Sequence, residues 1–131
     1  MGTVWFIYSD NELRKIEINS ILNGENSQIT MYYFWKHQLF FAYHQSIAPQ
    51  YVDNTEMIYH YTEKRVYFNT ERPFRCLEKA YEISTKDEQT IKPEDVANIE
   101  VNCTAIEFMN ENLKTVQQFK DLKKEISLCI W

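Results

Sequence analysis

The sequence predicts an α+β fold: a curved antiparallel β-meander of about five to seven strands with two or three helices packed on one face. Twelve of the twenty aromatic residues lie between Met31 and Phe68, which indicates a sheet with a large apolar face. Apolar and polar residues alternate through the first seventy positions, as in strands. The second half instead contains apolar residues at helical spacing.

Composition indicates one globular domain, residues 1–131. Of the 131 residues 44% are hydrophobic and 25% are charged, and two glycines and three prolines leave no linker or repeat. No secretory signal and no apolar run of membrane-spanning length is visible. Three widely spaced cysteines, Cys76, Cys103 and Cys129, are typical of reduced thiols. We therefore expect a cytoplasmic location.

The first two strands are predicted at Thr3–Ser9 and Glu12–Ile18, with a turn at Asp10-Asn11 that sets Trp5 opposite Ile16. A helix over residues 12–22 is the alternative, because Ser9-x-x-Glu12 resembles a capping box.

The next turn is predicted at Asn23-Gly24, a pair that suits a type I′ turn. It would place Ile18 opposite Ile29 and Ile16 opposite Met31. The apolar residues of the two strands would then share one face of the sheet, and the polar residues would share the other.

Two further hairpins are predicted. The strands Ile29–Trp35 and Leu39–Gln45 would be joined by Lys36-His37-Gln38, which sets three pairs opposite each other: Trp35 and Leu39, Tyr33 and Phe41, Met31 and Tyr43. Tyr32, Phe34, Phe40 and Ala42 would share the other face, either buried beneath a helix or forming an aromatic contact surface. The strands Glu56–Tyr61 and Val66–Asn69 would turn about Glu63-Lys64, with His60 and Tyr67 on one face.

The second half is predicted to be mostly helical. Pro73 suits the first turn of a helix that runs to about Ser84. The remaining elements are a helical turn within Lys92–Asn98, a strand at Ile99–Met109, a helix at Leu113–Ile126 and a docked tail at Ser127–Trp131.

Several kinds of chemistry are excluded by the residues present. Gly2 and Gly24 cannot form a glycine-rich phosphate loop, and no zinc-ligand spacing or nucleophile elbow occurs. We therefore expect no metal and no cofactor. A formal charge of −5 argues against direct nucleic-acid binding.

Two short motifs suggest one enzymatic alternative. His44-Gln45-Ser46 and His60-Tyr61-Thr62 are His-x-Ser/Thr units, and such a pair resembles the signature of the two-histidine phosphoesterases. The resemblance implies a metal-independent phosphodiester-cleaving enzyme in which His44 and His60 act as base and acid. A small-ligand carrier with an aromatic cavity is a further alternative.

The acidic residues support a different function. Residues 78–111 hold nine carboxylates and three lysines, a net charge of −6. Such a segment can steer a basic partner. We therefore expect a non-enzymatic binding protein, an acidic inhibitor similar in composition to bacterial immunity proteins, that neutralises a basic protein such as a toxin. The residues expected to contact the partner are Glu78, Glu82, Asp87, Glu88, Glu94, Asp95, Tyr32, Phe34 and Tyr67.

Overall fold

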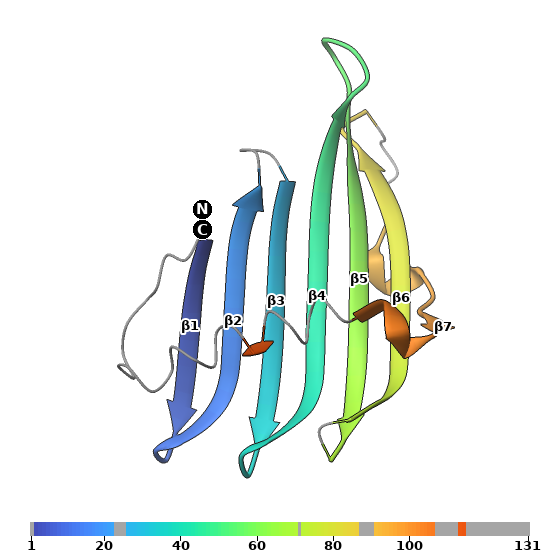
Figure 1. The fold of residues 1–131 in the computed structure, drawn as a ribbon. Helices are drawn as coiled ribbons and strands as arrows, with labels where there is room; N and C mark the ends of the chain where they lie inside the picture. The colour runs from blue at the N-terminus through green and yellow to red at the C-terminus, as the bar shows by residue number, and fades with distance from the viewer. Residues whose placement is uncertain (1, 23–25, 71, 87–90, 107–112, 115–131) are drawn as a thin grey trace.

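A computed structural model shows one seven-stranded antiparallel sheet in which each strand pairs with its neighbours in sequence (Figure 1). The structure describes residues 2–22, 26–70, 72–86, 91–106 and 113–114. The strands are β1 Gly2–Ser9, β2 Glu12–Leu22, β3 Asn26–Trp35, β4 Gln38–Tyr51, β5 Met57–Asn69, β6 Arg72–Ser84 and β7 Ile99–Val101. Two 3-10 turns, η1 Pro93–Asp95 and η2 Cys103–Ile106, flank β7.

The two faces of the sheet differ because successive side chains point to opposite sides of a strand. One row of directly paired residues crosses β2 to β6 and is almost wholly buried: Ile16, Tyr32, Ala42, Val66 and Cys76. We call this side the core face. The opposite side, which carries Lys15, Tyr33, Phe41, Tyr67 and Arg75 in one paired row, is the open face.

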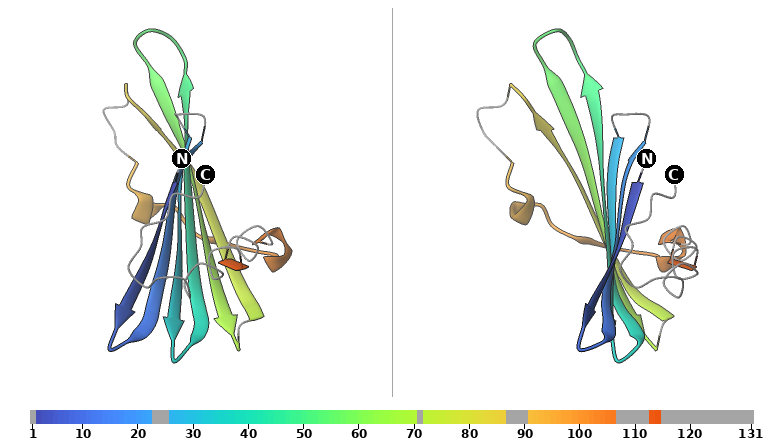
Figure 2. Two further views of the ribbon diagram at one scale, coloured as in Figure 1. Left: turned by 60° about the vertical axis from the view of Figure 1, so that its left-hand side comes forward. Right: turned by 90° about the vertical axis from the view of Figure 1, so that its left-hand side faces the viewer.

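After β6 the chain wraps around one edge of the sheet (Figure 2). It first passes the open face, where Lys79 Nζ donates a 2.7 Å hydrogen bond to the Pro93 carbonyl oxygen of η1. It then pairs as β7 with Cys76–Glu78 of β6 and reaches the core face at η2. Leu113 is buried in the core cluster. We call residues 91–106 the strap.

A disulfide joins Cys76 of β6 to Cys103 of the strap, with a Cα–Cα distance of 5.4 Å. The prediction of reduced thiols is therefore wrong for these two residues. Sequence spacing alone did not indicate the bond, because it is the wrapping of the strap that brings the two positions together. Cys129 lies outside the described residues.

The predicted α+β class is wrong. Helical structure among the described residues is confined to η1, η2 and Leu113–Lys114, and the predicted helix from Pro73 to Ser84 is strand β6. Within this segment Cys76 is buried on the core face, whereas its neighbour Arg75 lies on the open face, as alternation along a strand requires. Pairing with β5 along the whole of β6 outweighs the local pattern.

The predicted hairpin about Glu63-Lys64 is also wrong. Strand β5 runs without interruption through Glu63 and Lys64, and Tyr61 pairs with Ile47 and Tyr81. Charged residues in the middle of a strand resemble a turn in the sequence. Here Glu63 is instead held in place by hydrogen bonds on the open face.

Two registers are displaced by one residue from those predicted. Ile18 lies opposite Thr30 and Ile16 opposite Tyr32, and Trp5 pairs with Glu17. A shift of one residue exchanges the faces of a strand, so Tyr32 joins the core face and Met31 the open face.

The turns explain a further difference. The link between β3 and β4 has two residues, Lys36 and His37, both with positive φ as a type I′ turn requires. Trp35 therefore pairs with Gln38 and not with Leu39. A register shift between Tyr33 and Phe34 then restores the predicted pairing of Tyr33 with Phe41. The predicted turn at Asp10-Asn11 is confirmed, and so are strands in place of a helix over residues 12–22.

The C-terminal predictions are tested only in part. The turn of helix after Pro93 is present as η1, but the strand predicted at Ile99–Met109 ends at Val101. Of the helix predicted at Leu113–Ile126 only residues 113–114 are described, and the tail Ser127–Trp131 lies outside the described residues. No helix in the described part of the chain is long and apolar enough to cross a membrane.

The disulfide yields a direct test. Digestion without reductant should yield one peptide pair joined through Cys76 and Cys103, detected by mass spectrometry. The Cys103→Ser variant should lose about 3–4 kcal/mol in free energy of unfolding, because the bond closes a long loop in the unfolded chain. Alkylation of both residues in the unreduced protein would contradict the bond.

Candidate functional site on the open face

A group of aromatic side chains lies on β3, β4 and β5 on the open face. The ring centroids of Tyr33 and Phe41 are 5.8 Å apart, and those of Phe41 and Tyr67 are 5.1 Å apart. The ring centroids of Phe40 and Tyr33 are 6.5 Å apart, and Trp35 lies two residues after Tyr33 on β3. Trp35 is 57% exposed and Phe40 47% exposed. We call these five residues the aromatic band.

Cations lie over the rings of the band and are themselves paired with carboxylates. Arg14 lies 4.4 Å from the Trp35 ring centroid, and Lys15 lies 5.4 Å from that of Tyr33. Arg14 pairs with Glu12 at 3.4 Å, and Lys15 pairs with Glu17 at 3.2 Å. The cations thus cover part of the aromatic surface without leaving net positive charge.

The same arrangement recurs at the β6 side of the band. Arg75 lies 5.9 Å from the Tyr67 ring centroid and 3.9 Å from the Glu100 carboxylate of β7. Both partners of this ion pair are more than half exposed, so it adds little stability. Its position matters more, because it links the band to the strap.

Beneath the strap the open face holds a buried polar cluster centred on Glu63, which is 4% exposed. Its carboxylate accepts hydrogen bonds from Tyr81 Oη at 2.7 Å, from Tyr43 Oη at 3.0 Å and from Arg65 Nη2 at 2.9 Å. Arg65 also donates to Asn98 Oδ1 of the strap at 3.1 Å. Lys79, the residue paired with Glu63 across β5 and β6, is 7% exposed and holds Pro93.

The surroundings of Glu63 keep it ionised. Burial alone would raise the pKa of its carboxyl group, but the hydrogen bonds from Tyr81, Tyr43 and Arg65 and the charge of Lys79 lower it below its ordinary value. Burial and the hydrogen bond to Glu63 raise the pKa of Tyr43 to about 12, so its hydroxyl stays protonated and donates. The cluster is a structural network, and two of its members, Arg65 and Lys79, fasten the strap.

The acidic residues predicted to contact a partner are divided between places. Glu94 and Asp95 are exposed in η1, the part of the strap that passes the open face. Glu78 pairs with Lys64 across the strands, and a carboxylate oxygen of Glu82 lies 3.1 Å from His60 Nδ1. Both of these positions alternate onto the core-face side of β6. Asp87 and Glu88 lie outside the described residues.

The aromatic residues predicted to contact a partner are divided in the same way. Tyr32 and Phe34 are buried in the core, whereas Tyr67 belongs to the aromatic band. Sequence reasoning missed Trp35 and Phe40 as exposed residues. The type I′ turn propensity at Lys36-His37 was too weak to be recognised, and that turn determines which aromatic residues face outward.

The two histidines named by the enzymatic alternative are not brought together. His44 pairs with Lys64, and His60 lies four residues away from Lys64 along β5, a separation of about 13 Å. His44 is buried and its Nδ1 lies 2.7 Å from Thr30 Oγ1. His60 lies between Gln50 and Glu82. These imidazoles cannot flank one phosphate group.

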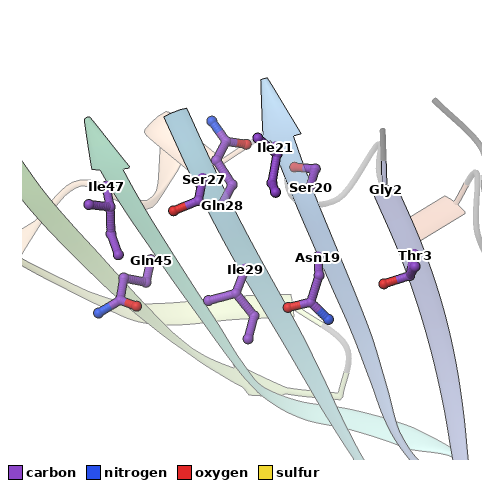
Figure 3. Close-up of a pocket in the computed structure, with 10 residues that line it drawn as sticks. All are labelled: Gly2, Thr3, Asn19, Ser20, Ile21, Ser27, Gln28, Ile29, Gln45 and Ile47. Atoms are coloured by element: carbon purple, nitrogen blue, oxygen red, sulfur yellow. The ribbon is translucent and has the colours of Figure 1, made fainter. Parts of the chain in front are cut away.

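A hollow of about 430 Å³ lies at the opposite end of β1–β4 from the band (Figure 3). Its lining combines isoleucine with amide and hydroxyl side chains: Gly2, Thr3, Asn19, Ser20, Ile21, Ser27, Gln28, Ile29, Gln45 and Ile47. Among the described residues that line the hollow, none has a side chain that is charged near neutral pH.

Comparison with known proteins adds no assignment. No family model, curated protein or solved structure matches this chain. Within the described residues, no group of three or more His, Cys, Asp or Glu side chains is placed to hold a metal ion. The interpretation of the site therefore rests on the open face itself.

Replacement of Glu63 by Gln should reduce the free energy of unfolding by about 2–4 kcal/mol, because it leaves Arg65 and Lys79 without their buried counter-charge. Urea denaturation measures the change. Glu17→Gln is the matched control, since it removes an ion pair on the same face whose side chains are 22% and 24% exposed, and it should cost less than about 1 kcal/mol. Equal effects of the two substitutions would contradict the role given to Glu63.

His44 should make stability depend on pH. Burial, and then the charge of Lys64, lower its pKa from 6.5 to about 4. Between those values the unfolded chain binds a proton that the folded chain does not, so stability falls as the pH drops from about 6.5 to about 4, by up to about 3 kcal/mol.

The measurement is urea denaturation at several pH values within that window. His44→Asn keeps a polar group near Thr30 but does not titrate, so the slope should flatten. An unaltered slope in His44→Asn would rule out His44 as its source.

Proposed function

We propose that this protein is a non-enzymatic binding protein whose open face holds a basic protein partner. The observation that carries the proposal is the aromatic band, in which exposed Trp35 and Phe40 adjoin the half-buried rings of Tyr33, Phe41 and Tyr67. Trp, Tyr and Phe are enriched at the centres of protein interfaces, where they contribute much of the binding energy.

Charge supports a basic partner. The three cations that lie over rings of the band, Arg14, Lys15 and Arg75, are each paired with a carboxylate. Glu94 and Asp95, exposed on the strap where it passes the open face, add negative charge on the same side of the sheet as the band, and the whole chain carries −5. Negative charge on a binding face speeds the encounter with a positively charged protein. An inhibitor that neutralises a basic toxin is one such protein, as the composition predicts.

The disulfide bears on the compartment. Cytosolic thiols are kept reduced, whereas structural disulfides persist in oxidising environments. The Cys76–Cys103 bond therefore favours an oxidising compartment over the cytoplasm predicted from the sequence. We include this location in the proposal.

The test uses tagged protein as bait for the proteins of its own host. Wild type should retain a basic protein, and the double variant Trp35→Ser/Phe40→Ser should bind it about 30-fold or more weakly, since two central aromatic anchors are lost. Tyr51→Ser, an exposed aromatic at the far end of β4, is the control and should bind normally. Affinities are measured by calorimetry with the purified partner.

A second variant tests the charge. Glu94→Gln/Asp95→Asn should slow association and flatten its dependence on salt, with little change in the dissociation rate. Retention of no basic protein, or equal binding by the double aromatic variant and wild type, would contradict the proposed function.

A further inference from the structure

Strand β1 forms one end of the sheet, and β2 is its only strand neighbour in the part of the chain that the structure describes (Figure 1). The outer edge of such a strand presents backbone N–H and C=O groups that can pair with another chain. Whether this edge is protected is decided by its side chains.

The two ends of the sheet differ sharply in this respect. Strand β6 carries Pro73 and several charged residues, and β7 covers its middle. Proline, charge and a covering strand are the devices that prevent edge-to-edge pairing. Strand β1, with the sequence GTVWFIYS, contains no proline and no charged residue over its eight positions.

The side chains of β1 are apolar on both faces. Trp5 and Ile7 are 49% and 43% exposed on the open face. Val4 is buried on the core face, and Phe6 packs beside it against the core cluster. Within the described residues β1 therefore carries none of these protective features, and its apolar side chains would lie next to those of a strand that pairs with it.

We propose that β1 pairs antiparallel with β1 of a second copy of this chain, about a two-fold axis at Trp5. Trp5 then lies opposite Trp5 of the second copy, Val4 opposite Phe6, and Thr3 opposite Ile7. The face of every residue is preserved, so the core rows and the open-face rows continue from one copy into the other. Because Val4–Ile7 are all apolar, two copies of β1 that run antiparallel place apolar side chains opposite apolar side chains.

This pairing stops at two copies. Of the two ends of the sheet in the described residues, only the β1 end lacks protective features; the two-fold axis pairs the β1 edges of both copies, and the side with β6 and β7 remains outermost. The association is therefore a closed dimer and not a fibre. It is independent of the proposed function, because the aromatic band contains no residue of β1.

Analytical ultracentrifugation of the full chain at concentrations on the order of 1–100 µM tests the proposal. Wild type should sediment as a dimer and Trp5→Lys as a monomer, because lysine on an edge strand blocks pairing. Phe40→Lys is the matched control: its aromatic side chain is 47% exposed on the same sheet but lies on an inner strand, so the dimer should persist. Circular dichroism and urea denaturation confirm that each variant folds.

Cross-linking tests the axis. In a Cys129→Ser background, Trp5→Cys should oxidise to a covalent dimer, because directly opposed residues of antiparallel strands have the Cα separation that a disulfide needs. Phe40→Cys should not. A wild type that is monomeric throughout the range, a dimer that survives Trp5→Lys, or equal cross-linking at both positions would overturn the proposal.

Discussion

A single antiparallel sheet has two faces, and the apolar side chains on each of them must be shielded from water. This requirement governs the structure of the protein. The core face meets it by burying apolar residues such as Ile16, Tyr32 and Val66. The open face meets it with aromatic rings covered by cations that are in turn paired with carboxylates. Each such contact is weak, but together they shield apolar surface without adding unpaired positive charge from Arg14 or Lys15.

Glu63 connects this face to the strap. Its carboxylate accepts hydrogen bonds from Tyr43, Tyr81 and Arg65. Arg65 also donates to Asn98 of the strap, and Lys79, which pairs with Glu63 across the strands, donates to Pro93. A buried carboxylate costs free energy unless its hydrogen bonds are complete. Because they are complete here, the charge orients the donors that fix the strap, and the position of the strap places Glu94 and Asp95 beside the open face.

Local pattern in the sequence was sufficient to predict the first four strands, because alternation there is strong and Asp10-Asn11 suits a tight turn, but it divided β5 at Glu63-Lys64. It failed at β6, where buried Lys79 interrupts the apolar alternation and Pro73 resembles a helix start. Registers were beyond its reach as well. The two-residue turn at Lys36-His37 and the register shift beside Phe34 decide which aromatic residues face outward, and neither has a distinct signature in composition. The concentration of aromatic residues on the sheet was thus predictable from the sequence, but their division between its two faces was not.

The bond between Cys76 and Cys103 turns the polypeptide around β6 into a covalent ring that spans a sequence separation of 27. Local opening of a meander normally starts at a terminal strand and proceeds inward. The ring tethers the β6 end, so peeling from that side is resisted. Amide protons of β5 and β6 should therefore exchange with solvent more slowly than those of β1 in the isolated monomer, which makes the N-terminal hairpin the labile part of the sheet.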